Sequence, residues 1–184
     1  ADAIGLNFYP SSPRYVTPQR AAQLARRIPP FVTVTALFVN AKPAEIEAVL
    51  AEVPVNLLQF HGDETESECR RWERPYIRAA RVRPGMDLLQ YASDFSSARA
   101  LLLDAFVEGY GGGGQVFDWS LIPADLPCPV ILSGGLTPEN VGDAVRRVRP
   151  AAVDVASGVE AAKGIKDAAK IAAFVAAVRA ADAT

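Results

Sequence analysis

The chain has 184 residues, of which 50% are hydrophobic and 22% charged, and its formal net charge at pH 7 is -2. This balance excludes the broadly basic surface of a nucleic-acid-binding protein, and no apolar run approaches the roughly 18 residues of a membrane span. The N-terminal residues lack the pattern of a signal peptide. The two cysteines, Cys69 and Cys128, lie too far apart in sequence for a metal-binding motif. We therefore expect a cytoplasmic globular protein with no metal site and with neither nucleic acid nor a membrane as partner.

Apolar runs and turn residues predict that strands alternate with helices along the chain. Seven strands are expected, over Ala3–Phe8, Phe31–Val39, Asn56–Phe60, Tyr76–Val82, Ala100–Leu103 with Asp104 at its end, Val130–Leu132 and Ala151–Val155. Helices are expected to start near Pro18, Ala44, Thr65, Asp87, Thr137 and Asp167. Asn40 is expected to cap the second of these helices, and Thr65 with Glu68 forms a capping box for the third.

Repeated strand–helix alternation is typical of an α/β protein with a parallel sheet and right-handed crossovers. We find no linker in the sequence and expect one domain over residues 1–184. A closed barrel of this kind takes eight strand–helix units, whereas seven are visible here. We therefore expect an N-terminally incomplete (βα)8 barrel, with roughly 20 or more residues before Ala1 that supply a strand and a crossover helix.

An acid and a glycine run follow the fifth expected strand. Asp104 ends the apolar run, and Tyr110 and Gly111–Gly114 lead toward Phe117-Asp118-Trp119. A carboxylate at the end of a buried strand beside a glycine-rich loop is typical of an acid–base site under a lid. The alternative is an aspartate that simply ends a strand before a flexible surface loop.

Two later strands each lead into a Ser-Gly motif, Ser133-Gly134-Gly135 and Ser157-Gly158. In eight-stranded α/β barrels the loops after the last two strands often bind phosphate through backbone N–H groups and a helix N-terminus. Glycine also serves tight strand-to-helix turns, so one motif alone is weak evidence. The pair in these adjacent positions favours a phosphate site.

Other candidate side chains stand at strand ends or in helices. Arg14 follows the first strand, and its guanidinium suits a carboxylate or phosphate, although an exposed loop arginine is equally common. His61, the single histidine, ends the third strand and is a candidate site residue. Cys69 and Cys128 are interpreted as structural, and Asp118 as a cap for a short helix.

Several motifs together resemble the phosphoribosylanthranilate isomerases of tryptophan biosynthesis, and the resemblance runs from Ala1 to about Lys170. These motifs are FYPSSPRYV (8–16), LFVN (37–40), LLQFHGDE (57–64), LLLDAF with GGGGQVFDW (101–119), LSGGLTPENV (132–141) and DVASGVE (154–160). The resemblance implies a (βα)8 TIM barrel. It also implies an Amadori rearrangement, without a cofactor, of N-(5-phosphoribosyl)anthranilate to 1-(2-carboxyphenylamino)-1-deoxyribulose 5-phosphate.

The resemblance also implies roles for individual residues. Asp104 matches the general acid that protonates the ribose ring oxygen and opens the ring to a Schiff base. Arg14 matches the residue that contacts the anthranilate part, and Gln59 and His61 line the same pocket. The phosphate-binding loops correspond to Gly134, Gly135, Ser157 and Gly158.

One departure concerns the general base. In the family a strand ending Lys-x-Cys-Gly-Ile-Thr carries the cysteine that removes the C2' proton, and neither Cys69 nor Cys128 matches it. This chain alone is therefore expected to be inactive if it is the whole molecule. The alternatives are a related sugar-phosphate barrel enzyme, a non-catalytic phosphate-binding barrel fragment, and a piece of a bifunctional fusion. The expected assembly is a monomer or a homodimer.

Overall fold

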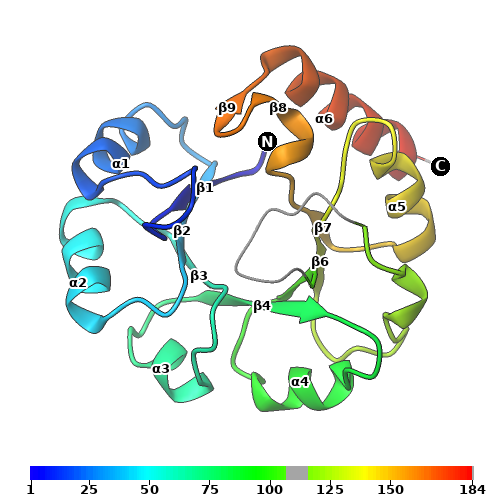
Figure 1. Ribbon diagram of the computed structural model, residues 1–184, viewed down its shortest axis with the longest axis horizontal. Coiled ribbons are helices and arrows are strands. Elements are labelled where there is room, and N and C mark those ends of the chain that lie inside the picture. Colours follow the sequence, from blue (N-terminus) through cyan, green and yellow to red (C-terminus); the bar gives the residue numbers. More distant parts are fainter. Residues whose placement is uncertain (107–115, 184) are drawn as a thin grey trace. The chain divides into compact units, whose positions relative to one another are not determined.

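The computed structural model describes residues 1–106 and 116–183, and the predicted lid segment with Tyr110 and Gly111–Gly114 lies outside these described residues. Contacts within the chain divide it into two compact units. The first unit comprises residues 1–79 and 97–99, and the second comprises residues 80–96 and 100–184. Each unit is built from strands and helices that alternate along the chain (Figure 1).

The first unit contains parallel strands joined by helices. In chain order its elements are β1 (Ala3–Asn7), α1 (Pro18–Ala25), β2 (Thr33–Phe38), α2 (Pro43–Glu52), β3 (Leu57–Phe60), α3 (Glu66–Arg70) and the first part of β4 (Tyr76–Val82). β1 pairs with β2, β2 with β3, and β3 with β4, all in parallel. The capping box at the start of α3 is confirmed, because Thr65 Oγ1 accepts from Glu68 N and Thr65 N donates to the Glu68 carboxylate.

Aromatic side chains form one row in the core of this unit. Phe8 stacks on Phe38 with ring centroids 5.5 Å apart, Phe38 lies 6.3 Å from Phe60, and Phe60 meets Tyr76 edge-on at 5.9 Å. All four rings are buried. Because side chains alternate along a strand, Gln59 lies on the opposite face of β3 from Phe60. The aromatic row thereby fixes which residues face the other side of the sheet.

The second unit continues the same alternation. Its elements are the end of β4, α4 (Leu88–Asp94), β5 (Leu101–Ala105), the 3-10 helix η1 (Trp119–Leu121), β6 (Val130–Leu132), α5 (Val141–Val148), β7 (Ala152–Val153), the 3-10 helix η2 (Ser157–Val159), the strands β8 (Glu160–Ala162) and β9 (Ile165–Lys166), and α6 (Ala168–Asp182). β5, β6 and β7 pair in parallel, and β8 pairs with β9 in an antiparallel hairpin. The hairpin was absent from the sequence-based expectation.

The core of the second unit orients strand β5. Leu101 and Leu103 pack with Leu88 and Ala92 of α4 in one buried cluster. Leu102 and Asp104 therefore project from the opposite face of β5. Asp118 caps η1 by accepting from Ser120 N at 3.0 Å, as predicted, and Asp167 caps α6 by accepting from Lys170 N.

Several predicted boundaries differ from the structure, among them that of the seventh strand, which is limited to Ala152–Val153, and the following three show what replaced the predicted pattern. Phe31 precedes strand β2, because a turn closed by Val32 N on Pro29 O carries Phe31 to φ 72 and full exposure. Asn40 does not cap α2; its Oδ1 accepts from Asp63 N, and the helix follows Lys42 instead. Helix α5 begins at Val141 rather than near Thr137, and residues 138–140 before it form a turn in which Val141 N donates to Thr137 O.

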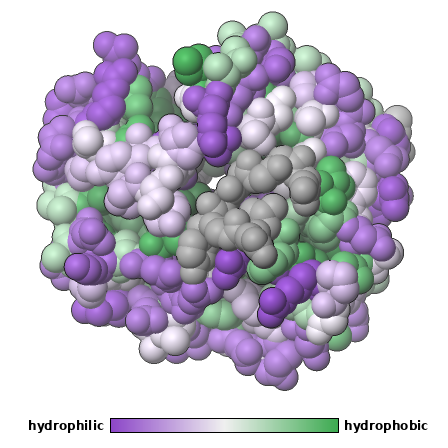
Figure 2. All heavy atoms as spheres, in the orientation of Figure 1, coloured by the Kyte–Doolittle hydropathy of each residue, from purple (hydrophilic) through white to green (hydrophobic). Residues whose placement is uncertain are grey.

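The exposed surface over the helices of each unit is largely hydrophilic, with scattered hydrophobic residues between (Figure 2). Within the described ranges, no helix combines the length and the hydropathy that crossing a membrane would require.

Candidate active site

Asp104 is the second-to-last residue of β5 and lies on the face of the strand that points away from α4. Its side chain is half-buried, and its Oδ1 accepts a hydrogen bond from Ala105 N at 2.8 Å. The sequence analysis placed this carboxylate at the carboxyl end of a buried strand, and the structure confirms that position. A carboxyl group held there by a backbone N–H is oriented without being fully removed from solvent.

The loop after β6 runs directly beside Asp104. Ser133 N donates to Leu103 O at 2.8 Å, which joins the start of the loop to β5. Gly134 and Gly135 have φ values of 82° and 63°, a region that favours glycine. A Cβ on Gly134 would lie 2.7 Å from both Asp104 Oδ1 and Ala105 N, so only glycine allows this approach. The structure thus brings the predicted acid and the first predicted phosphate loop together.

The second predicted phosphate loop packs against the first, backbone on backbone. A Cβ on Gly158 would overlap the carbonyl oxygen of Leu136 and would lie 3.2 Å from the Cα of Thr137. The Asn140 side chain braces the first loop by donating to Gly135 O at 2.9 Å and accepting from Thr137 N at 2.8 Å. Ser133, Gly134, Gly135, Ser157 and Gly158 therefore belong to one compact arrangement in the second unit.

Two residues near these loops were missed by the sequence analysis. Asp154 follows β7 as Asp104 ends β5, and its Oδ2 accepts from Ser133 Oγ at 3.1 Å. Lys166 donates to Ala156 O at 2.6 Å and to Glu160 Oε1 at 3.1 Å, which ties hairpin β8–β9 to the residue before Ser157. The position of Asp154 at a strand end was a usable signal, whereas the hairpin that presents Lys166 had no clear sequence pattern.

Arg14 lies in the turn after β1 in the first unit and is half-buried. Its backbone N donates to Ser12 Oγ at 3.1 Å, and the same hydroxyl accepts from Asn7 Nδ2 at 3.2 Å. Val16 N donates to Asn7 O, so the turn is closed on the end of β1. The predicted location of Arg14, in the loop that follows the first strand, is confirmed.

Gln59 and His61 are adjacent on one face of β3 and the residues that follow it. They are 7% and 8% exposed, and Gln59 Nε2 lies 3.3 Å from His61 Nδ1. His61 N also donates to Phe38 O at 2.9 Å, which extends the pairing of β2 and β3 by one residue. The structure therefore brings together two of the predicted substrate-binding side chains within the first unit.

A buried ion pair next to His61 was also missed by the sequence analysis. Arg78 of β4 and Glu64 approach to 3.2 Å, and their side chains are only 4% and 8% exposed. A buried charge needs a partner and hydrogen bonds for every polar atom, so such a pair is costly unless it is well satisfied. The only hint in the sequence is that Arg78 interrupts the apolar residues of β4.

Neither cysteine has the properties of a reactive thiol. Burial raises the pKa of the Cys69 thiol to about 12, and burial likewise raises the pKa of the Cys128 thiol. Both cysteines are free of disulfide bonds. Over the described part of the chain, no group of three or more His, Cys, Asp or Glu side chains is arranged to hold a metal ion.

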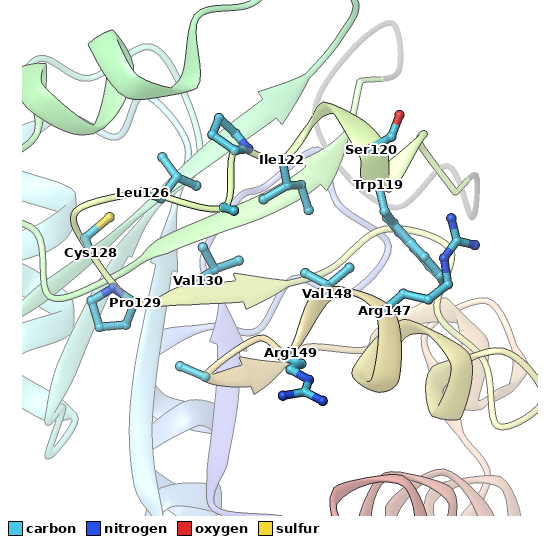
Figure 3. A pocket seen from close by; sticks show the side chains of 13 residues that line it. Trp119, Ser120, Ile122, Leu126, Cys128, Pro129, Val130, Arg147, Val148 and Arg149 are labelled. Carbon is cyan, nitrogen blue, oxygen red and sulfur yellow. The ribbon is translucent and has the colours of Figure 1, made fainter. Parts of the chain in front are cut away.

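A cavity of about 480 Å³ opens in the second unit away from these strand ends. Ile122, Leu126, Val130 and Val148 surround it, and the Arg147 guanidinium stacks on Trp119 at its rim, 5.2 Å from the ring centroid (Figure 3). Val130 is the first residue of β6, whereas Ser133 follows its last residue. The cavity therefore lies at the amino end of β6 and is separate from the Asp104 site.

Residues 1–177 match the family described as N-(5'phosphoribosyl)anthranilate (PRA) isomerase. The chain belongs to this family. It is 68% identical over 182 residues to the N-(5'-phosphoribosyl)anthranilate isomerase of Dechloromonas aromatica, an alignment that covers 99% of this chain and 88% of the relative. It therefore belongs with the PRA isomerases of tryptophan biosynthesis.

Solved structures of PRA isomerases show the same fold. One, in complex with reduced 1-(o-carboxyphenylamino)-1-deoxyribulose 5-phosphate, has a TM-score of 0.84 and 39% identity and covers 98% of this chain and 88% of its own. Another, of monomers generated from the dimeric Thermotoga maritima enzyme, has a TM-score of 0.85 and 37% identity, with the same coverage. The chain thus has the α/β TIM-barrel fold of its family, as the sequence predicted.

Proposed function

We propose that Asp104 is the general acid of the isomerisation and donates its proton to the ribose ring oxygen of N-(5-phosphoribosyl)anthranilate. Cleavage of the ring C–O bond then leaves a protonated Schiff base between C1' and the anthranilate nitrogen. The observation that carries this proposal is how closely the Gly134 backbone passes Asp104, since a Cβ on Gly134 would lie only 2.7 Å from Asp104 Oδ1. This close approach supports a general acid that lies directly beside the loop proposed to bind the phosphate.

Substrate chemistry explains why that contact matters. The ring oxygen and the phosphate ester are joined through the adjacent carbons C4' and C5', so a group that protonates the oxygen must stand close to the phosphate site. We assign the phosphate to the N–H groups of Gly134, Gly135, Ser157 and Gly158. Glycine permits the backbone to approach an anion closely, and successive backbone N–H groups form concave anion sites. Asp154 is a further acceptor for a ribose hydroxyl on the same side of the sheet.

For the first unit, the proposal assigns Arg14, Gln59 and His61 to the anthranilate end of the substrate. The planar guanidinium of Arg14 suits a carboxylate, with which it can form two parallel hydrogen bonds. Gln59 and His61 supply polar groups from an otherwise apolar strand, which suits an aromatic ring that carries polar substituents. These assignments follow the family resemblance, residue by residue.

The base that removes the C2' proton is neither Cys69 nor Cys128. A general base must be deprotonated at the working pH and within hydrogen-bond reach of the proton that it removes. With its pKa raised to about 12, Cys69 keeps its proton at neutral pH. Loss of the C2' proton converts the Schiff base to an enolamine, and tautomerisation of the enolamine gives the ketone product, so the reaction needs no external oxidant or reductant.

The direct test replaces Asp104 by asparagine in the full-length protein. Asparagine keeps the size of the side chain and its acceptor for Ala105 N, so the fold and KM should change little. The kcat should fall by roughly 10²-fold or more, the usual scale for an acid–base group. Asp118→Asn, at an exposed helix cap, is the control and should leave kcat near its original value. Near-normal turnover of Asp104→Asn would remove Asp104 from the mechanism.

Two further features belong to this proposal. Two free cysteines without a disulfide support a cytoplasmic location.

The dimeric state of the Thermotoga maritima relative supports a homodimer for this chain as well. Light scattering on the purified full-length protein should give twice the chain mass, and a single-chain mass across the concentration range would contradict the dimer.

A further inference from the structure

The guanidinium of Arg78 donates hydrogen bonds to the backbone on both sides of His61. Its Nη1 donates to Phe60 O at 2.9 Å, and its Nη2 donates to Gly62 O at 2.8 Å. The two nitrogens of one rigid, planar group therefore fix the carbonyls that precede and follow the histidine. Five donors in a fixed fork make arginine suited to this task, and lysine has no equivalent geometry.

Glu64 completes the brace from the other side. Its Oε2 accepts from Gly62 N at 2.9 Å and from Arg78 Nη1 at 3.2 Å, while its Oε1 accepts from Asn40 N at 2.7 Å. Asn40 Oδ1 in turn accepts from Asp63 N at 2.7 Å. Asn40, two residues after the end of β2, and the turn that follows β3 are thus joined through one buried carboxylate. No Cβ fits at Gly62, where it would overlap the Asn40 side chain.

The fixed turn determines what the His61 ring can do. Gln59 Nε2 is an amide nitrogen that only donates, so His61 Nδ1, 3.3 Å away, is the acceptor of this contact. In the neutral ring the proton then lies on Nε2, which makes His61 a donor at that atom. A small rotation of the His61 backbone would lengthen the contact with Gln59 and release this preference.

We infer that Arg78 and Glu64 are positioning residues that hold His61 as the Nε2–H tautomer for substrate binding. The inference rests on the proposed role of His61 and Gln59 at the anthranilate end. Arg78 does not touch the substrate in this account. It acts through the two carbonyls that flank His61, and Glu64 keeps its guanidinium in place.

The test uses Arg78→Lys in the full-length protein. Lysine keeps a cation beside Glu64, which avoids an unpaired buried carboxylate, but it cannot span both carbonyls. Residues 1–184 contain a single histidine, and the signals that are absent from the spectrum of His61→Ala identify its imidazole nitrogens by NMR. At about pH 8, where histidine side chains are ordinarily neutral, the original protein should show the Nε2–H tautomer alone. Arg78→Lys should show both tautomers, with KM raised roughly tenfold and kcat within about twofold of the original value.

Arg74→Met is the matched control, since exposed Arg74 also donates to a backbone carbonyl of this unit, Val55 O at 3.2 Å. It should alter neither the histidine signals nor KM. A double variant, Glu64→Gln with Arg78→Met, removes both charges and should reproduce the mixed tautomers; this variant decides the matter if Arg78→Lys fails to fold. Histidine signals in Arg78→Lys that match those of the original protein would overturn the inference.

His61→Ala separates this inference from the proposed function. If His61→Ala raises KM while Arg78→Lys leaves KM unchanged, the positioning role is overturned although the role of His61 stands. If His61→Ala leaves KM unchanged, the assignment of His61 to the substrate fails. In that case the tautomer signals alone decide whether Arg78 and Glu64 hold His61 as the Nε2–H tautomer.

Discussion

The candidate residues of the first unit are side chains that other side chains hold in place, whereas those of the second unit consist mostly of backbone. Gln59 and His61 are buried, touch each other and lie next to the Glu64–Arg78 pair. In the second unit Gly134 and Gly135 have positive φ values, and the backbone at Gly134 and Gly158 lies too close to neighbouring atoms for a side chain. Asp104 stands beside that backbone and is only half-buried.

This difference fits the two tasks that the proposed function gives to these residues, phosphate binding in the second unit and anthranilate binding in the first. A phosphate is recognised well by N–H groups that every residue carries, so the main requirement is a backbone conformation that glycine allows. An aromatic carboxylate needs particular side chains, and those require support from their neighbours. Substitutions should therefore damage the two units in different ways.

Gly158→Ala should produce the largest loss of binding among the following tests. The added methyl group would collide with the Leu136 carbonyl, which belongs to the backbone and cannot rotate aside. Relieving this overlap costs about 1–3 kcal/mol and moves the second loop, so KM and the inhibition constant of inorganic phosphate should rise together by roughly 10- to 100-fold.

Gly142→Ala is the matched control for that variant. A Cβ on Gly142, in helix α5 of the same unit, would meet no atom closer than 3.5 Å. Alanine is the better helix former by roughly 0.5–1 kcal/mol, so this variant should be slightly more stable and bind phosphate normally. Unchanged phosphate inhibition in Gly158→Ala would show that the loops do not hold the anion.

Arg14→Met should weaken binding of the substrate without weakening binding of inorganic phosphate. Loss of a charge-assisted contact to the anthranilate carboxylate should raise KM roughly tenfold, since hydrogen bonds to charged groups contribute about 1.5–3 kcal/mol. Inhibition by inorganic phosphate, which lacks the aromatic part, should remain as in the original protein. The KM of Arg14→Lys should lie between those of the original protein and Arg14→Met, because lysine keeps the charge but cannot form two parallel hydrogen bonds. A parallel rise of both constants would assign Arg14 to the phosphate instead.

The two thiols offer the mildest comparison, since one lies in each unit. Cys69 is fully buried with a pKa of about 12, and Cys128 is half-exposed. At pH 8, alkylation of Cys69 in the folded protein should be much slower than alkylation of Cys128, because the thiolate is the nucleophile. Peptide mass mapping after a timed reaction with iodoacetamide measures both rates, and equal rates would contradict the burial of Cys69.

The raised pKa of Cys69 also predicts the direction in which the stability of the protein changes with pH. The folded protein holds this proton more tightly than the unfolded chain, so its contribution to stability is complete below the ordinary thiol pKa of 9.0 and declines as pH rises toward about 12. Urea unfolding should show a loss of stability between these values that is smaller in Cys69→Ala. An equal pH dependence in both proteins would refute the assignment.

Sequence patterns predicted the seven parallel strands, the order of the elements and the positions of Asp104 and the two Ser-Gly loops, but not the hairpin β8–β9 or the contacts of Asp154 and Lys166. The strands could be predicted because apolar runs mark buried strands, and the positions of Asp104 and the Ser-Gly loops follow from where those strands end. That the loops bind phosphate stays a prediction. The Thr65 capping box, the Asp118 cap and the start of the last helix near Asp167 were predicted from equally local patterns. The roles of Asp104 and Arg14 came from the family resemblance.

What the sequence did not reveal depends on partners distant along the chain. Asn40 is a good helix-capping residue, yet its side chain and N–H are taken by Asp63 and Glu64. The Glu64–Arg78 pair spans 14 residues and is recognisable only once β3 and β4 lie side by side. Lys166 became visible as a loop brace only through the hairpin β8–β9.

The central claim is that Asp104 acts beside a phosphate site formed by backbone N–H groups. A crystal structure of the full-length protein with reduced 1-(o-carboxyphenylamino)-1-deoxyribulose 5-phosphate tests it most directly. We predict the phosphate at the N–H groups of Gly134, Gly135, Ser157 and Gly158, with N···O distances of about 2.7–3.2 Å. The Asp104 carboxylate should hydrogen-bond to the hydroxyl that corresponds to the former ring oxygen. A phosphate bound elsewhere with these loops empty, or a ligand whose former ring oxygen has no contact with Asp104, would contradict the claim.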